Sequence, residues 1–493
     1  MIHAHLPILQ IILPLAAAPI CILLRRSVPV LAFSVATTWA TFAISIALLR
    51  RVLETGVISY QLGGWAAPWG IEYRLDILGA FVLLFVSGIG ALALSFSPKS
   101  LSREIAEDRH YLFCAAYLLC LCGLLGIVIT GDLFNLFVFL EISSLSSYAL
   151  ISLGSDRRAL AAAFQYLVMG TIGATFILIG IAFLYVMTGT LNMVDMAAQL
   201  SSVSGVRTIV VAFAFLIVGI SIKMAFFPLH QWLPNAYTYA PSVVTAFLAA
   251  TATKVSVYML LRLVFTVFGA QFAFDSMRLG AILMPLAIGG ILVASTVAIF
   301  QRDVKRMLAY SSVAQIGYMV LGASFATVTG LTAGIVHLFN HALMKGGLFL
   351  AMGCIMFRLG SVDLDDMRGM GKRMPLTMLA WVLGGLGLIG IPATAGFITK
   401  WYLIRAAIES GFWPIAALVL MSSLLAVVYV WRVVEVAYFQ EPSERGARVR
   451  EAPLSMQIPT LILIGATILF GLWTSLSTGV ATSAAEGLLG VLP

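Results

Sequence analysis

Long apolar segments recur along almost the whole chain, and they constrain its fold more than any other feature. A helix that spans a membrane needs about 20 mostly apolar residues. Segments of that kind occupy residues 6–24, 28–49, 76–97, 110–130, 132–153, 160–187, 207–238, 241–267, 279–300, 307–324, 328–358, 376–409, 411–438 and 456–478. Because only helices and closed barrels satisfy all backbone hydrogen bonds in lipid, we predict an all-α polytopic membrane protein with about 14 transmembrane helices.

The composition supports this class and excludes others. Hydrophobic residues make up 61% of the chain and charged residues 10%, whereas a soluble domain carries about 25% charged residues. The net charge of +8 is spread over short loops, so we expect the lipid bilayer, and no nucleic acid, as a partner. The cysteines lack zinc-site or disulfide spacing, and we expect small buried apolar side chains at Cys21, Cys114, Cys120, Cys122 and Cys354.

The sequence contains no nucleotide-binding loop, no nucleophile triad and no haem or iron–sulfur ligand set. We therefore expect no cofactor, no bound metal ion and no enzyme activity belonging to this chain alone. A membrane protein without an energy source of its own must use an ion gradient or a partner that drives it. These features favour a subunit of a secondary transporter.

The positions of the basic residues predict the orientation. No lysine or arginine precedes the first apolar segment, and Arg25 and Arg26 follow it, which is unlike a standard signal peptide. The positive-inside rule then places the N-terminus outside the cell. The longest polar stretches, residues 97–109, 358–375 and 439–454, fall on the inner side. An even number of helices places the C-terminus outside as well.

Two apolar segments are too long for one plain helix, and each contains a proline, Pro228 in 207–238 and Pro392 in 376–409. A proline removes a backbone hydrogen bond, and in a membrane this defect persists only where protein or a cavity covers it. We therefore predict two broken helices. Paired broken helices are typical of transporters built from inverted repeats, so we predict two five-helix repeats.

The predicted repeats divide the chain into four regions. Residues 1–109 hold the N-terminal transmembrane helices, and residues 110–267 form the first repeat. Residues 279–438 form the second, inverted repeat. Residues 439–493 hold a cytoplasmic loop and the last transmembrane helix.

A lysine and a glutamate lie inside these apolar segments. Lys223 comes five residues before Pro228, and Glu141 lies near the middle of 132–153. A charged side chain at the bilayer centre costs about 2.5–3.5 kcal/mol on insertion scales, so it normally faces the protein interior. Glu141 and Lys223 are either a fixed ion pair between helices or a switchable pair from which Lys223 can release a proton.

Further titratable residues lie in the later segments. Lys254 and Lys400 are either proton carriers or lysines that extend to the membrane surface. His337, His341 and Lys345 are spaced by four, which places them on one helix face. Because histidine titrates near neutral pH, this stripe can relay protons. The alternatives are a metal site, for which no third ligand is evident, and a histidine that only packs.

Four of these stretches are similar to known sequences. They are Gly131–Gly154, Lys223–Ala240, Asp303–Gly317 and His337–Phe349. They resemble the proton-translocating antiporter-like subunits shared by Mrp-type cation/proton antiporters, respiratory complex I and membrane-bound hydrogenases. The stretches 131–141 and 188–193, and the absence of a long C-terminal extension, look most like the D-type subunits of Mrp antiporters.

The resemblance implies a fourteen-helix fold and a role for each residue. Glu141 and Lys223 would form the coupling ion pair, and Lys254 the central relay. His337 and His341, beside Lys345, would link the half-channels, and Lys400 would be the terminal site. It also implies a bacterial cell membrane, transport of protons and Na⁺ or another monovalent cation, and partner subunits of the Mrp A, B, C, E, F and G types.

Two other functions stay open. One is a proton-pumping subunit of a redox complex similar to complex I or a membrane-bound hydrogenase, which would make the assembly a translocase enzyme. The other is a scaffold that conducts no ions. Four lysines and a glutamate inside apolar segments argue against a scaffold, because such residues are expensive to insert.

Overall fold

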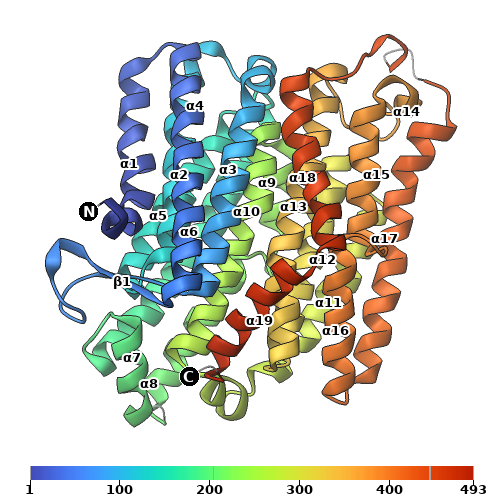
Figure 1. Ribbon diagram of the computed structural model, residues 1–493. Helices are drawn as coiled ribbons and strands as arrows, with labels where there is room; N and C mark the ends of the chain where they lie inside the picture. The colour runs from blue at the N-terminus through green and yellow to red at the C-terminus, as the bar shows by residue number, and fades with distance from the viewer. Residues whose placement is uncertain (1, 204, 443–445, 492–493) are drawn as a thin grey trace.

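The computed structural model, which describes residues 2–203, 205–442 and 446–491, is a bundle of long helices that run between two opposite ends (Figure 1). Within these residues, 11 helices are long and apolar enough to span a membrane. The predicted all-α polytopic class is therefore confirmed. Each of the predicted apolar segments contains at least one helix of the bundle.

The first half of the chain follows the predicted segments closely. Its long helices are α1 (Leu6–Leu24), α2 (Ser27–Thr55), α3 (Ile77–Glu104), α4 (His110–Ile129), α5 (Leu133–Ser152), α6 (Arg157–Thr188) and α10 (Ser242–Leu261). In the second half, the unbroken helices are α11 (Leu279–Ile299), α12 (Val304–Ser324), α13 (Val328–Leu359), α17 (Trp413–Phe439) and α18 (Leu454–Leu472).

Both predicted helix breaks are present. The first separates α8 (Arg207–Lys223) from α9 (Trp232–Tyr239), and the second separates α15 (Pro375–Ile389) from α16 (Ala395–Glu409). Each break contains an alanine in the left-handed region, Ala225 with φ 56° and Ala393 with φ 71°. A residue with a Cβ is strained there by about 1–2 kcal/mol, so tertiary contacts must hold both breaks open.

Several elements were not predicted from the sequence. A hairpin of β1 (Ile58–Gln61) and β2 (Glu72–Leu75) projects from the bundle, and α7 (Met193–Val203) lies beside it. Residues 456–478 were predicted as one helix, but α18 ends at Leu472 and α19 (Ser475–Leu489) turns obliquely across α3 and α13. These elements are too short or too polar for a hydropathy signal.

Short elements complete the chain. Single turns of 3-10 helix occupy Ile2–His5, Leu62–Gly64, Glu107–Arg109 and Gly446–Arg448, and α14 is Met370–Arg373. Two π-helical turns, Arg262–Val267 and Phe272–Ser276, follow α10. π-Helical turns are rare and frequently lie at functional sites.

Residues 97–109, 358–375 and the described parts of 439–454 lie at one end of the bundle (Figure 1). The guanidinium of Arg103 lies 5.6 Å from the centroid of the Phe357 ring. Arg358 donates hydrogen bonds of 2.9 and 2.6 Å to the carbonyl of Glu451. Segments far apart in sequence therefore form one polar end surface.

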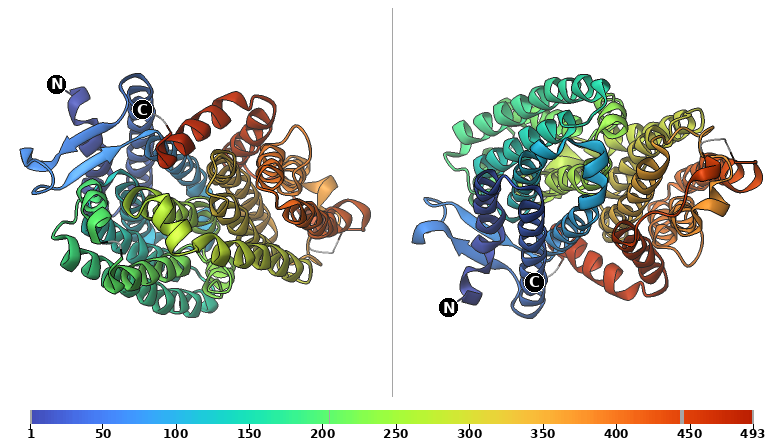
Figure 2. Two further views of the ribbon diagram at one scale, coloured as in Figure 1. Left: turned by 90° about the horizontal axis from the view of Figure 1, so that it is seen from below. Right: turned by 90° about the horizontal axis from the view of Figure 1, so that it is seen from above.

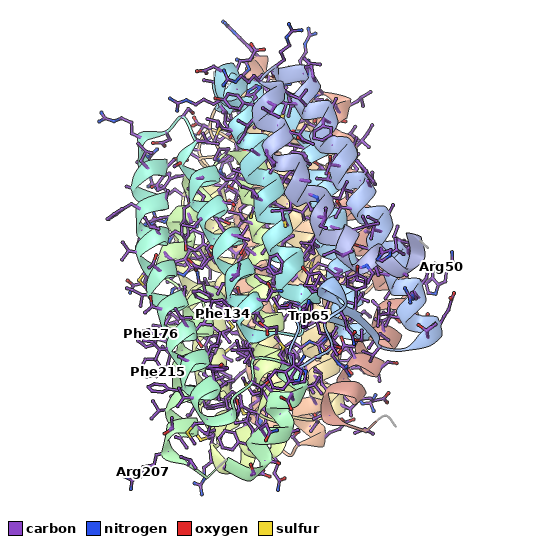
Figure 3. The ribbon with its side chains drawn as sticks, turned by 90° about the vertical axis from the view of Figure 1, so that its left-hand side faces the viewer. Arg50, Trp65, Phe134, Phe176, Arg207 and Phe215 are labelled. Carbon is purple, nitrogen blue, oxygen red and sulfur yellow. The ribbon has the colours of Figure 1, made fainter. Side chains whose placement is uncertain are left out.

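Helices α10 and α13 form the centre of the molecule. Viewed along the bundle, earlier helices lie on one side of them and most later helices on the other, while α19 crosses back toward α3 (Figure 2). Over the most apolar stretch of each segment, 94% of the residues are buried in 242–267 and 78% in α13, whereas 39% are buried in α6 and in α17. The outer flank is apolar, with Phe134, Phe176 and Phe215 along it and Arg207 at its lower edge (Figure 3). The titratable residues of the two central helices are thus shielded on every side.

The second break predicts a specific sensitivity to added volume. A Cβ at Gly396, in the first turn of α16, would overlap the carbonyl oxygen of Gly387 in α15. We expect Gly396→Ala to destabilise the protein by roughly 1–3 kcal/mol or more, because overpacking displaces backbone. Gly465→Ala in α18 is the matched control, since a Cβ there meets nothing within 4 Å. The thermal unfolding midpoint of the detergent-purified protein would be measured, and equal midpoints for both variants would contradict this.

Candidate functional site

Lys223 and Glu141 form the ion pair expected from the sequence. Lys223 is the last residue of α8, and its Nζ lies 3.7 Å from Oε1 of Glu141 near the middle of α5. Nζ also donates a hydrogen bond of 2.9 Å to Oγ of Ser144. The side chain of Lys223 is 3% exposed and that of Glu141 is 31% exposed. Lys223 is therefore buried, whereas its carboxylate partner lies close to the protein's flank.

The first break is held in place by an aromatic stack. Trp232, the first residue of α9, donates a hydrogen bond of 3.0 Å from Nε1 to the carbonyl of Ile222. Its ring stacks on Tyr166 of α6 with centroids 3.9 Å apart and planes 4° from parallel. The indole thus gives a second hydrogen bond to a carbonyl that already accepts one of 3.1 Å from the backbone N–H of Ala225. The same contact fixes the end of α8, and with it the backbone of Lys223.

A cavity of about 20 Å³ separates Lys223 from α10. Its polar lining is hydroxyl groups and the lysine itself, from Ser143, Ser144, Ser147, Tyr166, Lys223 and Ser256. A site of roughly 10–15 Å³ with polar walls holds one water molecule. The cavity therefore has the size and the lining that a single bridging water requires.

Lys254 lies in the middle of α10 and is completely buried. Its Nζ donates to the carbonyl of Ala249 and, over 3.3 Å, to Oγ1 of Thr253. It does not extend to a membrane surface, so that alternative is excluded. No carboxylate lies within 4.0 Å of it in the described part of the chain.

His337 and His341 stack on one face of α13, with ring centroids 5.4 Å apart. Nδ1 of His337 is hydrogen-bonded to Oγ1 of Thr399 over 3.1 Å. Within the described residues, neither ring nitrogen of His341 has a hydrogen-bond partner, and Nε2 of His337 has none either. No third histidine, cysteine, aspartate or glutamate completes a metal site with them among the residues that are described.

Lys345 is fully buried one turn beyond His341, but its ammonium reaches the neighbouring helix. Nζ donates a hydrogen bond of 2.7 Å to the carbonyl of Leu308 in α12, and another to Oγ of Ser311. Lys345 therefore starts on the same face of α13 as the two histidines, but its side chain leaves that face. Its lysine connects α13 to α12.

Lys400 lies below the second break and is 7% exposed. Its Nζ donates to the carbonyls of Leu388 and Ile389, at 3.3 and 2.7 Å, and to Oγ of Ser423 at 2.7 Å. Leu388 and Ile389 are the last residues of α15, so the ammonium sits at the negative end of a half-helix. A groove of about 570 Å³ with mostly apolar walls reaches it from the flank between α16 and α17.

Two residues that the sequence did not single out connect His337 to Lys400. The Tyr318 ring lies 5.7 Å from the His337 ring and 5.4 Å from Nζ of Lys400, and its hydroxyl is hydrogen-bonded to Ser422. Thr399 precedes Lys400 and binds His337. A hydroxyl in an apolar helix is too common to be informative by itself, so only the packing identifies them.

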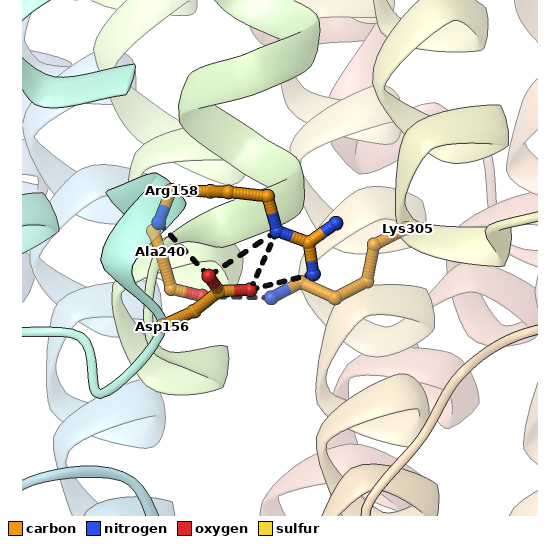
Figure 4. A network of polar contacts seen from close by, with 4 residues as sticks. All are labelled: Asp156, Arg158, Ala240 and Lys305. Carbon is orange, nitrogen blue, oxygen red and sulfur yellow. Dashed lines mark hydrogen bonds and ion pairs between the residues drawn. The ribbon is translucent and has the colours of Figure 1, made fainter. Parts of the chain in front are cut away.

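A charged cavity of about 540 Å³ opens at the polar end of the bundle. Its charged lining residues are Arg103, Glu104, Asp156, Arg158, Asp303, Lys305 and Arg358. Lys305 is 2% exposed and donates a hydrogen bond of 2.7 Å to the carbonyl of Ala240, while Arg158 pairs with Asp156 at 2.7 Å (Figure 4). Burial raises the pKa of Asp303, which its hydrogen bond from the Arg306 backbone and the charge of Lys305 offset only in part.

Comparison with known proteins finds likeness over nearly the whole chain. The family profile "NADH:quinone oxidoreductase/Mrp antiporter, TM" matches residues 130–426. NADH-quinone oxidoreductase subunit N of Desulforudis audaxviator (strain MP104C) is 43% identical over 485 residues, 95% of this chain and 96% of that protein. The D-type subunit of the Na(+)/H(+) antiporter of Bacillus subtilis (strain 168) is 30% identical over 483 residues, 98% of this chain and 97% of that protein. A chain of the Mrp complex from Dietzia sp. DQ12-45-1b matches with a TM-score of 0.91 and 27% identity, covering 100% of this chain and 98% of that one.

The environment of Lys254 predicts that this lysine lowers stability. Its ammonium is buried without a carboxylate partner, and burying an unpaired charge is costly. We therefore expect Lys254→Met to leave the thermal unfolding midpoint unchanged or to raise it. Lys372→Met, at an exposed position, is the control and should change nothing. A clear fall in the midpoint for Lys254→Met would show that the lysine is a structural support.

Proposed function

The chain belongs to the NADH:quinone oxidoreductase/Mrp antiporter transmembrane family, and on that premise we propose that it moves protons across the membrane as one subunit of a larger assembly. It is a complex I-like membrane subunit with many spans. We propose specifically a multisubunit antiporter that exchanges protons for Na⁺ or another monovalent cation. The chain is then a transporter subunit and not an enzyme by itself.

One observation carries this proposal: in the described part of the chain, four buried lysines lie inside the apolar segments with a single carboxylate among them. Lys223, Lys254, Lys345 and Lys400 are between 0% and 7% exposed. Glu141 is the one carboxylate within 4.0 Å of any of these four in the described ranges. A fixed structural role would favour a full partner for each charge. Partners that are mostly carbonyls and hydroxyls fit ammonium groups that gain and lose protons.

The proposed pathway starts at Glu141 and Lys223. When the pair separates, the ammonium of Lys223 loses its counter-charge. It then gives a proton to a water molecule, for which the cavity beside α10 has room. Lys254 takes it up as an amine and becomes an ammonium. Lys345 holds a second buried charge next to this step. The proton then passes through His341 and His337 to Lys400, with the hydroxyl of Thr399 as the bridge.

The ring nitrogens of the two histidines support this pathway. Three of their four nitrogens have no partner in the described residues. Buried polar groups are nearly always hydrogen-bonded, and ordered water is the usual partner when protein is not. A histidine pair with one nitrogen on Thr399 and three available to water can accept a proton on one nitrogen and release one from another.

Protons would enter from the charged cavity at the polar end of the bundle. Its floor is Lys305, which precedes Leu308 and Ser311 by one and two turns of α12. Those two residues bind Lys345, so α12 connects the cavity floor to the row of lysines. We propose that this end faces the cytoplasm of a bacterial cell and that both termini face outside, as the basic residues predict.

The proposed partners are the other subunits of such an antiporter, of the A, B, C, E, F and G types. The matched Dietzia protein is part of a complex named for that system. The coupled cation would cross mainly through those subunits. Residues 110–267 and 279–438 would act as two inverted repeats, each with one broken helix and one lysine at its break.

A second function is favoured by a specific observation. The relative with 43% identity is named as a subunit of an NADH-quinone oxidoreductase. In that case the same row of lysines would be driven by electron transfer in partner subunits, and the assembly would be a proton-pumping enzyme.

Removing either member of the ion pair tests the pathway. We expect Glu141→Ala and Lys223→Ala each to reduce cation-driven proton transport to background, because the step that releases the proton needs both charges. Transport would be followed by a pH-sensitive dye in everted vesicles, with assembly checked by native gel. Asp365→Asn, which breaks an exposed ion pair at the polar end, is the control. Full transport in either alanine variant would refute these roles.

The identity of the partners separates the two functions. We expect the assembly purified through a tag on this chain to contain several small membrane subunits and no iron–sulfur or flavin protein. Mass spectrometry and an absorption spectrum of the purified assembly would measure this. Iron–sulfur absorbance that co-purifies in stoichiometric amount would establish the redox pump.

A further inference from the structure

A groove lies between α2 and α3, which run side by side at the front of Figure 1. It has a volume of about 820 Å³. The first turns of α2 form one wall and the last turns of α3 form the other, so the groove opens toward the polar end of the bundle. Ile105, Glu107 and His110, between α3 and α4, complete it at that end. None of the residues proposed for the proton pathway lines it.

The groove has the depth of one membrane leaflet. On α2 its lining extends from Ser27 to Ala36, which is about 14 Å at 1.5 Å per residue, and the hydrocarbon core of a bilayer is about 30 Å thick. At the deep end, Nε1 of Trp39 donates a hydrogen bond of 3.0 Å to Oγ of Ser95, which ties α2 to α3. The groove is therefore open at the level of the lipid headgroups and closed near the middle of the bilayer.

The lining changes in polarity along this depth. The wall on α2 below Ser27 carries only apolar side chains, which are Val28, Leu31, Ala32, Val35 and Ala36. Their spacing by three and four places them on one face of the helix. Most of the polar lining groups gather at the rim, and these are Ser27, Lys99, Ser102, Glu107 and His110. An apolar slot with a charged rim fits a phospholipid, whose acyl chains and headgroup divide in the same way.

The rim carries one cation and one carboxylate of opposite charge. Lys99 and Glu107 are both exposed, and neither forms an ion pair with any residue that the structure describes. His110, in contrast, is 3% exposed and fixed, with Nδ1 hydrogen-bonded to Oγ of Ser27 over 2.7 Å and Nε2 to the carbonyl of Ile105 over 3.2 Å. The charges available to a ligand are therefore one ammonium and one carboxylate.

We propose that this groove binds one phospholipid with a primary amine in its headgroup, phosphatidylethanolamine, from the leaflet at the polar end. The lipid phosphate pairs with Lys99 and accepts a hydrogen bond from Ser102. The lipid ammonium donates charge-assisted hydrogen bonds to Glu107. One acyl chain occupies the apolar slot as far as Trp39. Basic pockets between transmembrane helices bind lipid headgroups in other membrane proteins, and the carboxylate at this rim adds the preference for an amine. The proposal does not depend on the proposed function.

Two other occupants make different predictions. Solvating lipid contacts any apolar flank in proportion to its abundance, so it would not distinguish one headgroup from another. A transmembrane helix of a partner subunit would exclude lipid from the groove altogether.

Photo-crosslinking separates these occupants. The complete assembly, purified through a tag on this chain, would be reconstituted in phosphatidylcholine vesicles with a trace of phosphatidylethanolamine that carries a diazirine in one acyl chain. Mass spectrometry would locate the crosslinked residues. We expect crosslinks within residues 28–36 of α2, reduced several-fold by excess unlabelled phosphatidylethanolamine and much less by an equal excess of phosphatidylglycerol. Equal competition by the two lipids would overturn the proposal, and so would the absence of crosslinks in these residues.

The carboxylate at the rim is tested by removing its charge. Glu107→Gln keeps the shape of the side chain but cannot pair with a lipid ammonium, so we expect phosphatidylglycerol to compete as well as phosphatidylethanolamine does. Asp108→Asn is the matched control, because Asp108 is the next residue, is exposed and does not line the groove. An unchanged preference in Glu107→Gln would contradict the assignment of the headgroup.

Filling the slot tests the position of the acyl chain. Ala36→Phe places a ring in the deep part of the groove, and we expect it to reduce the crosslinks several-fold. Ala40→Phe, one turn further along α2 and outside the lining, should retain them. Both alanines are exposed, so equal thermal unfolding midpoints in detergent would show that both variants fold. Undiminished crosslinking in Ala36→Phe would overturn the proposal.

Discussion

The structure depends on how a membrane-embedded core accommodates ammonium groups that have almost no carboxylates beside them. Taking an ion out of water costs several kcal/mol even after the protein relaxes, and Glu141 pairs with only one of the buried lysines. Backbone carbonyls accept hydrogen bonds from the other buried ammonium groups. Lys400 donates to the carbonyls that end α15, and Lys305 donates to the carbonyl that follows α9. The carbonyl end of a helix carries a partial negative charge that favours a cation.

The helix breaks therefore supply backbone carbonyls that stabilise ammonium groups inside the bundle. The breaks themselves are strained. Ala225 and Ala393 are held in the left-handed region, and the stack of Trp232 on Tyr166 holds the indole against the carbonyl of Ile222. A carbonyl stabilises an ammonium less firmly than a carboxylate does, because it carries only a partial charge. Lysines held in this way are not locked to one partner, and this is what a group that passes on protons would require.

Helices α10 and α13 place this chemistry at the centre. Together they carry Lys254, His337, His341 and Lys345, and helices on both sides shield them (Figure 2). The proposed row of titratable groups would run through these two helices. Charged cavities lie at the two ends of α10.

The sequence by itself determined the class of fold, the apolar segments, both helix breaks and the identity of the buried charges. It could do so because hydropathy, proline and the cost of a charge in lipid act locally along the chain. The tertiary structure alone decided which groups meet. It directed Lys345 to α12, placed Tyr318 and Thr399 between His337 and Lys400, and brought Asp76 to Arg262 across 186 residues. Side-chain direction and the packing of distant helices set these contacts, and neither is encoded in the spacing of residues within one segment.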